Sequence, residues 1–153
     1  MWVQFLLLAL ALLALGLVVF PDVGCEDALN DYISDRLNTG KYYFRVFTNN
    51  VSPGTGSVAG SFTEATWAGY APVVSNTITF GPVTLVGHVA SVTGSAIVFP
   101  NTSGVSQTAY GIFVTDSTGL VLYYAERDPA APVSVPNGGQ YIYTPNLQLK
   151  SIN

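Results

Sequence analysis

Residues 108–126 read TAYGIFVTDSTGLVLYYAE, and this stretch decides the fold. Its two halves, residues 108–115 and 120–126, are rich in aromatic, aliphatic and β-branched side chains, which favour strands. Between them lies the short polar segment from Asp116 to Gly119, which has the composition of a tight turn. Two such runs joined by a turn predict an antiparallel β-hairpin.

The chain on either side of this hairpin also has a β-forming composition. Residues 41–48 (KYYFRVFT) are largely apolar at both alternating sets of positions, which predicts a central strand covered on both faces. Further strands are predicted over residues 77–80, 83–90, 95–99 and 140–152. Pro145 interrupts the last of them and indicates an edge or a bulge, and residues 127–140 are a Pro-rich connection. About eight strands separated by turn signals predict a mainly β domain, an antiparallel β-sandwich or jelly roll.

One short amphipathic helix is predicted over residues 26–38, before the first strand. Its apolar positions recur at the spacing of one helical face, at Leu29, Tyr32, Ile33 and Leu37. Glu26 and Asp27 in the first turn and Arg36 in the last match the helix dipole, and Gly40 follows as a stop signal. A helix of about three turns is too short to stand alone. We therefore expect it to cover one face or end of the sheet.

Residues 1–20 form a hydrophobic N-terminal segment, and residues 21–153 are predicted to form a single domain. As a helix, residues 2–20 would extend about 28 Å, just enough to span a bilayer. The segment is interpreted as a signal peptide, a retained membrane anchor or a helix packed in an assembly. A signal peptide normally carries Lys or Arg near its start, and this segment contains neither. A lipoprotein motif before Cys25 is also disfavoured, because Asp22 stands where such a motif normally has an aliphatic residue. An over-extended gene start is a further alternative.

Composition excludes several classes of function. Only 9% of the residues are charged and the formal net charge is −4. Because the five Lys and Arg residues are scattered singly, the chain has no basic stripe for nucleic acid. A polar surface with few charges suits contacts between copies, since few ions must be desolvated.

The sequence predicts no catalytic, metal or cofactor site. His88 is the sole histidine, and a triad with Asp116 or Asp128 is arithmetically available, but no G-x-S-x-G elbow occurs and His88 lies between apolar residues. Cys25, the sole cysteine, has no partner for an intramolecular disulfide, and neither C-x-x-C nor H-x-x-x-H spacing is present for zinc. We therefore expect a protein that is not an enzyme.

Two polar loops and a set of tyrosines are the candidate contact sites. The loops are residues 49–60 and 101–106, and the residues predicted to make contacts are Asn49, Asn50, Ser52, Asn101, Thr102 and Ser103. Both loops contain an N-x-S/T glycosylation pattern. Aromatic faces suit sugars, but core and interface roles are the main interpretation of the tyrosines, which are Tyr70, Tyr110, Tyr123, Tyr124, Tyr141 and Tyr143.

Residues 26–150 resemble a class of small bacteriophage virion proteins, described as tail or minor structural proteins. The resemblance rests on three motifs: a strand that ends in F-T-N at residues 47–49, the W-A-G-Y-A step at residues 67–71, and a G-I-F…D…G…L-Y hairpin over residues 111–123. It implies a structural role in a virion. The apolar N-terminal segment departs from the pattern of that class.

These observations together predict a non-enzymatic structural protein, a tail-associated or head-decorating virion subunit that associates with itself or with other virion proteins. Residues 1–20 could add a membrane contact, and no nucleic-acid partner is expected. The alternative is an exported or membrane-anchored bacterial surface protein, either a pilin-like filament subunit or a carbohydrate-binding module.

Overall fold

The computed structural model describes residues 19–20, 25–87 and 89–151. These residues form a mainly β structure with antiparallel strand pairs and an α-helix, which confirms the predicted β class. The hydrophobic helix expected in the N-terminal segment falls on residues 1–18, outside the described residues. The last two residues of that segment form strand β1 (Val19–Phe20), which pairs in parallel with the end of β12 (Asn146–Ser151).

The predicted hairpin is present as β8 (Gly111–Thr115) and β9 (Leu122–Arg127), which pair antiparallel. Its turn is held by the Asp116 carboxylate, whose Oδ1 accepts hydrogen bonds from the backbone N–H groups of Leu120 (3.1 Å) and Val121 (3.2 Å). Gly119 follows with φ of 75°, a conformation that glycine adopts without strain. Local turn chemistry therefore fixes this hairpin.

The predicted central strand is confirmed as β2 (Tyr43–Phe47), which pairs with β8 on one side and with β3 (Val73–Val74) on the other. The strand order of this sheet is β3-β2-β8-β9. One face carries Phe44, Val46, Ile112 and Val114 into the main core. The opposite face packs Phe47 and Phe113 against Phe62, with the Phe62 and Phe113 rings stacked at 5.3 Å. Because both faces of β2 are covered, both alternating sets of its residues are largely apolar.

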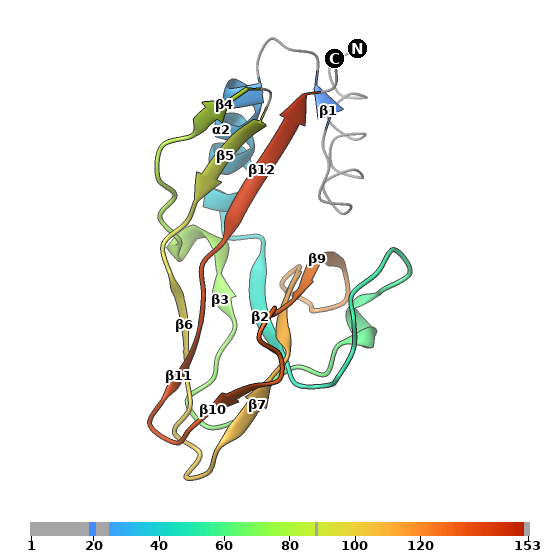
Figure 1. Cartoon of the computed structure of the whole chain (residues 1–153), viewed down its shortest axis with the longest axis vertical. Helices are drawn as coiled ribbons and strands as arrows, with labels where there is room; N and C mark the ends of the chain where they lie inside the picture. Colours follow the sequence, from blue (N-terminus) through green and yellow to red (C-terminus); the bar gives the residue numbers. More distant parts are fainter. Residues whose placement is uncertain (1–18, 21–24, 88, 152–153) are drawn as a thin grey trace.

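A long antiparallel ribbon runs along the other side of the molecule (Figure 1). Its two chains are β5 (Val89–Thr93) followed by β6 (Ile97–Pro100), and β11 (Gln140–Tyr143) followed by β12. Tyr143 pairs with Ile97 and Asn146 pairs with Thr93, so residues 94–96 lie opposite residues 144–145 and the register shifts by one residue. The backbone N–H of Gly94 donates to the Pro145 carbonyl at 2.9 Å within this shift.

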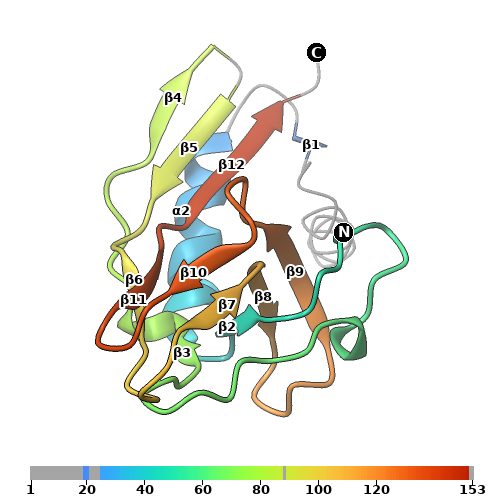
Figure 2. The same ribbon diagram turned by 60° about the horizontal axis from the view of Figure 1, so that its bottom comes forward.

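Helix α2 (Cys25–Asp35) covers one face of the upper sheet, whose order is β1-β12-β5-β4 (Figure 1, Figure 2). Leu29 of the helix packs with Ala90, Val92 and Leu149 in a second core cluster. The α-helix is shorter than the predicted 26–38 because a 3-10 helix, η1 (Leu37–Thr39), takes over its last turn. β4 (Thr84–Val86) forms the edge of this sheet.

Several predicted strands are divided or absent. The run predicted over residues 83–90 is a hairpin of β4 and β5, broken where Gly87 has φ of 60°. The predicted strand over residues 77–80 is wrong: a 3-10 helix, η3 (Ser75–Thr77), occupies its start, and Phe80 makes a single bridge to Gly94.

A two-stranded pairing was missed at the end of the molecule opposite α2. The Pro-rich connection contains β10 (Val133–Val135), which pairs with β7 (Gln107–Ala109). β7 had been predicted as the start of the β8 strand, but the chain changes partner at Gly111. Short strands flanked by prolines carry too few residues for a sequence pattern to reveal them.

Candidate functional site

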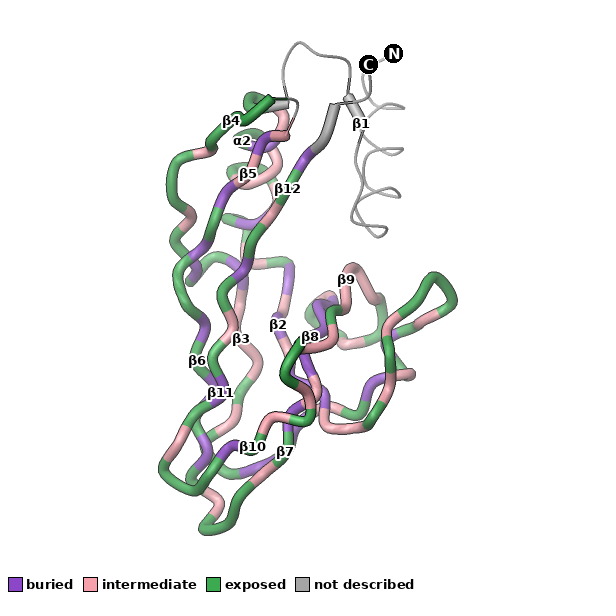
Figure 3. Tube along the Cα trace, in the orientation of Figure 1, coloured by how far each residue is buried: buried purple, intermediate pink, exposed green. Residues whose placement is uncertain are grey.

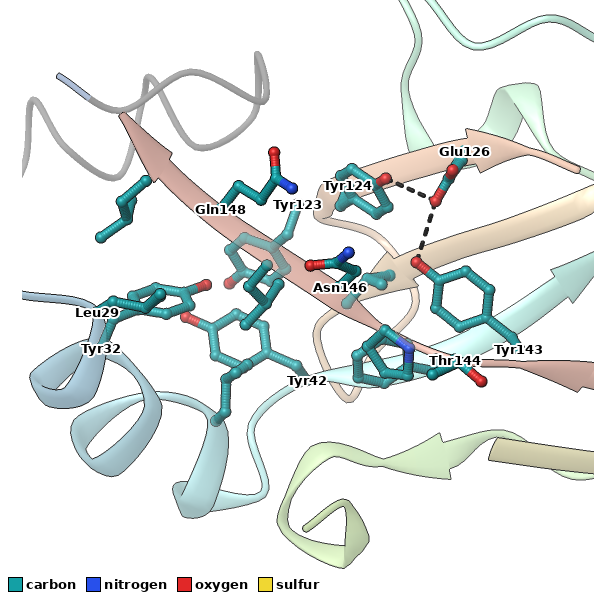
Figure 4. A pocket seen from close by; sticks show the side chains of 16 residues that line it. Leu29, Tyr32, Tyr42, Tyr123, Tyr124, Glu126, Tyr143, Thr144, Asn146 and Gln148 are labelled. Carbon is teal, nitrogen blue, oxygen red and sulfur yellow. Dashed lines mark hydrogen bonds between the residues drawn. The ribbon is translucent and has the colours of Figure 1, made fainter. Parts of the chain in front are cut away.

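A cleft of about 440 Å³ opens between α2, β9 and β12. Figure 4 shows side chains from all three elements pointing into this space. Tyrosines form much of its wall, aliphatic residues form its floor, and polar residues stand at its rim. The lining residues are Leu29, Tyr32, Leu37, Tyr42, Phe44, Val114, Tyr123, Tyr124, Glu126, Tyr143, Thr144, Pro145, Asn146, Leu147, Gln148 and Leu149.

The inner end of the cleft is a cluster of three tyrosines. Tyr42 at the start of the central strand meets Tyr123 edge to face, with ring centroids 4.8 Å apart. Burial raises the pKa of Tyr32 and of Tyr42 above the usual range for phenols, and Arg36 acts in the opposite direction on both pKa values. These phenols therefore stay neutral at physiological pH and present apolar rings with hydrogen-bonding tips.

The outer end is organised around the Glu126 carboxylate. Its Oε2 accepts hydrogen bonds from the Tyr124 hydroxyl at 2.8 Å and from the Tyr143 hydroxyl at 3.1 Å (Figure 4). Burial is the largest cause that raises the pKa of Tyr124 and of Tyr143, and Glu126 raises both pKa values further. Because Glu126 is exposed, its carboxylate is accessible from solvent at the mouth of the cleft.

The polar rim of the cleft consists of residues of β12 together with Thr144, which comes just before Pro145. Thr144, Asn146 and Gln148 are exposed, whereas Leu147 and Leu149 alternate with them toward α2. Among the described lining residues there is one carboxylate and no Lys, Arg or His. The arrangement can hold a molecule with an apolar body and a polar or cationic end, and it offers no paired nucleophile and base.

The structure divides the six tyrosines that the sequence singled out. Tyr123, Tyr124 and Tyr143 meet in the cleft. Tyr70 and Tyr141 lie elsewhere in the core, where each packs on Phe99. Tyr110 packs instead under Arg127, whose guanidinium carbon lies 5.2 Å from the centre of the Tyr110 ring. Tyr32 and Tyr42 were not singled out, although Tyr32 was already placed on the apolar stripe of the helix.

The first predicted contact loop is braced from within. Asn49 Nδ2 donates to the Ser61 carbonyl at 2.9 Å, and Asn49 Oδ1 accepts from the Thr63 N–H at 2.9 Å. Asn49 therefore spans the two ends of the loop, and its amide is committed to the fold. Asn50 and Ser52 are exposed and leave this loop with side chains that face solvent.

The second predicted contact loop requires a correction at Asn101, which is 0% exposed. Its Nδ2 donates to the carbonyls of Val105 (2.9 Å) and Val135 (2.8 Å), and its Oδ1 accepts from Ser103. Asn101 thus clamps the loop to β10 and cannot serve as a contact residue or a glycosylation site in the folded protein. Thr102 is exposed and Ser103 is half-buried.

The described residues give little support to the catalytic triad and the metal site considered above. His88 lies outside them. Asp116 serves the hairpin turn, and Asp128 accepts a hydrogen bond from the Tyr141 hydroxyl at 2.8 Å. Within residues 25–87 and 89–151, no group of three His, Cys, Asp or Glu residues is arranged to hold a metal ion.

A second candidate site is the apolar edge at β4. Leu85 and Val86 on this strand are 51% and 77% exposed, and the whole strand faces solvent (Figure 3). In the part of the chain that the structure describes, no strand pairs with the outer side of β4. Its N–H and C=O groups on that side are free to form hydrogen bonds to another strand.

Comparison of the chain with protein-family models, curated proteins and solved structures found no significant match. No helix in the described residues is long and apolar enough to cross a membrane.

Proposed function

We propose that this protein is a non-enzymatic structural subunit that associates with copies of itself, and that its assembly is a bacteriophage virion. The observation that carries the proposal is the open β4 edge with Leu85 and Val86 exposed. Native proteins protect edge strands with charges, prolines, bulges or very short length. The β4 strand has three residues, and they include no charge and no proline.

The apolar surface exposed at this edge would contribute to a contact between copies. Fully burying a Leu or Val side chain contributes about 1.5–3 kcal/mol. Leu85 and Val86 are already partly covered, so their complete burial in an assembled copy would contribute about 2–4 kcal/mol together. Backbone hydrogen bonds to the edge would add directionality, as in β-strand addition.

A second exposed apolar site, on the part of the ribbon formed by β6 and β11, supports the proposal. Val98 and Ile142 are directly paired across β6 and β11, and both are exposed. The alternate residues of these strands, Phe99 and Tyr141, are buried in the core. At this pair the outward face of the ribbon is apolar where solvent would normally select polar residues.

We also propose that the domain is sandwich-like. The support is the main core cluster, in which Phe44 and Ile112 of one sheet share a core with Phe99 and Tyr141 of the ribbon. The rings of Phe44 and Tyr143 face each other across this core with centroids 6.4 Å apart. The more specific proposal is that the strands are connected as in a jelly roll.

The experiment that tests self-association is sedimentation velocity of the native chain and of the double variant Leu85→Thr, Val86→Thr. Threonine has the β-branched shape that strands favour and reduces the apolar surface. The matched control is Leu120→Thr, because Leu120 is even more exposed but lies on the β8–β9 turn. Assembly that persists unchanged in the double variant would refute a contact through β4.

An exported or membrane-anchored surface protein remains the rival proposal, either as a pilin-like subunit or as a carbohydrate-binding module. The exposed amides of Asn146 and Gln148 beside the tyrosines are the groups that the second form would use. The intact mass of the protein from its source separates the two proposals. A full-length chain in a large particle supports the assembly proposal, and a monomer that lacks about twenty residues supports export.

A further inference from the structure

We propose that the tyrosine-lined cleft binds an organic ammonium ion with an apolar body, such as an alkylated amine that carries an aromatic or aliphatic group. The cationic head would lie at the Glu126 end, and the apolar body would lie against Leu29, Leu147 and the inner tyrosines. This binding site is independent of the β4 edge and goes beyond the proposed structural role.

The charges around the cleft favour a cation. Glu126 supplies the formal negative charge of the lining, and its Oε2 already accepts both tyrosine hydroxyls, which hold the carboxylate beside the cleft. The faces of aromatic rings are electron-rich and attract cations within about 6 Å. An anionic ligand would meet a carboxylate and no basic side chain among the described lining residues.

The two ends of the cleft also differ electrically, which orients the ligand. Arg36 acts on Tyr32 and Tyr42 at the inner end, whereas Glu126 acts on Tyr124 and Tyr143 at the outer end. A cationic head is therefore repelled from the inner end and attracted to the outer one. Figure 4 shows Glu126 and the Tyr32–Tyr42 pair on opposite sides of the cleft.

The floor of the cleft decides against a saccharide as the occupant. Leu29, Leu37, Val114 and Leu147 present no hydrogen-bonding side-chain atoms, and a sugar that entered the cleft would bury hydroxyl groups against them. An unpaired buried hydroxyl costs about 1–3 kcal/mol, which several hydroxyls would multiply. An alkylated ammonium ion has an apolar surface that suits the same floor.

The test compares two probes of the same shape with the full-length chain. Phenyltrimethylammonium carries the charge, and tert-butylbenzene is its neutral carbon isostere. Binding is followed by the tyrosine resonances in NMR titrations. We expect the cation to bind at least about fivefold more tightly, a difference of about 1 kcal/mol.

Three variants locate the charge effect. Glu126→Gln keeps an acceptor for the tyrosine hydroxyls, removes the charge, and should remove most of the preference for the cation. Tyr124→Phe keeps the ring and should bind nearly as well, whereas Tyr124→Leu should weaken the cation several-fold. The matched control is Asp116→Asn, which removes a carboxylate at the hairpin turn outside the cleft and should leave binding unchanged.

Several results would overturn the proposal. One is equal binding of the two probes in the native chain, which would make the cleft a general apolar pocket. Another is an unchanged preference in Glu126→Gln. Saturable binding of a disaccharide such as cellobiose, with shifts of the same tyrosine resonances, would assign the cleft to a sugar instead.

Discussion

Asn101→Asp is the substitution that most directly tests how the second polar loop is built. The native amide donates two hydrogen bonds, at 2.9 Å to the Val105 carbonyl and at 2.8 Å to the Val135 carbonyl, from a fully buried position. Aspartate has the same shape but replaces the NH2 group with oxygen. Each of the two carbonyls then faces an acceptor where it previously met a donor.

The magnitude follows from these contacts. Each lost hydrogen bond contributes about 1–1.5 kcal/mol, and the carboxylate must either stay ionised among carbonyl oxygens or bind a proton. We expect the free energy of unfolding to fall by about 3–5 kcal/mol at neutral pH. This is a large part of the total stability of a domain of this size.

The pH dependence of the variant provides an independent check. Burial against carbonyl oxygens should raise the pKa of the introduced carboxyl group in the folded state above its ordinary value of about 3.9. Between that value and the raised pKa, the folded state holds more protons than the unfolded state, so stability falls as pH rises. The cost of the substitution should therefore be smaller at pH of about 4 than at pH of about 8, because the protonated group recovers one donor.

Urea denaturation of the native chain, Asn101→Asp and Asn50→Asp measures this effect. Asn50 is the matched control because it is exposed, lies in the other predicted contact loop and undergoes the same chemical change. Its cost should stay within about 0.5 kcal/mol. If the two variants lose equal stability, or if Asn101→Asp shows no dependence on pH, the clamp described here is incorrect.

Two further predictions concern the β-sheet core. Gly111→Ala should destabilise the protein by more than about 3 kcal/mol in urea denaturation, because its methyl group would overlap the Glu126 carbonyl oxygen and lie 2.8 Å from the Phe47 ring. Gly56→Ala, which has open space around it, is the control, and a similar cost in both variants would contradict this reasoning. In alkaline solution, burial raises the pKa of Tyr70 and Tyr141 in the folded state, so the contribution of these two phenols to stability should be constant below the ordinary phenol pKa of about 10 and fall above it. Phenolate absorbance that develops fully before any loss of structure would contradict that expectation.

Local chemistry explains which parts of the fold the sequence could predict. The β8–β9 hairpin and the central strand β2 follow from turn residues and from apolar runs within a few positions of one another. The ribbon pairs residues 89–100 with residues 140–151, and no local pattern specifies such a distant partner or its register shift at Pro145. β10 escaped prediction because three residues between prolines are too few for their alternation to indicate a strand.

The candidate sites, too, could be predicted only in part, because their residues come from distant parts of the chain. The tyrosines on β9 could be singled out, but their meeting with Tyr32 of the helix and with Tyr42, just before β2, depends on how α2 packs on the sheet. Asn101 was placed in a contact loop because polar loop residues usually face solvent. Its real role depends on carbonyl groups of Val105 and Val135 that need a buried donor, which composition does not reveal.

Several of the few charges of this chain are used within the fold, and this bears on how its surface meets other molecules. Arg45 pairs with Glu64 at 2.6 Å, and Arg127 donates to the Val51 carbonyl at 3.1 Å. Asp116 holds the hairpin turn through backbone N–H groups. Apart from the exposed acidic residues of α2, which are Glu26, Asp27, Asp31 and Asp35, the described surface is mainly hydroxyl, amide and apolar. Such surface loses less hydration free energy on contact than ionised groups do. A surface of this kind favours close contact between identical copies, because copies with many like charges would repel each other. We expect such a contact to begin at the exposed β4 edge.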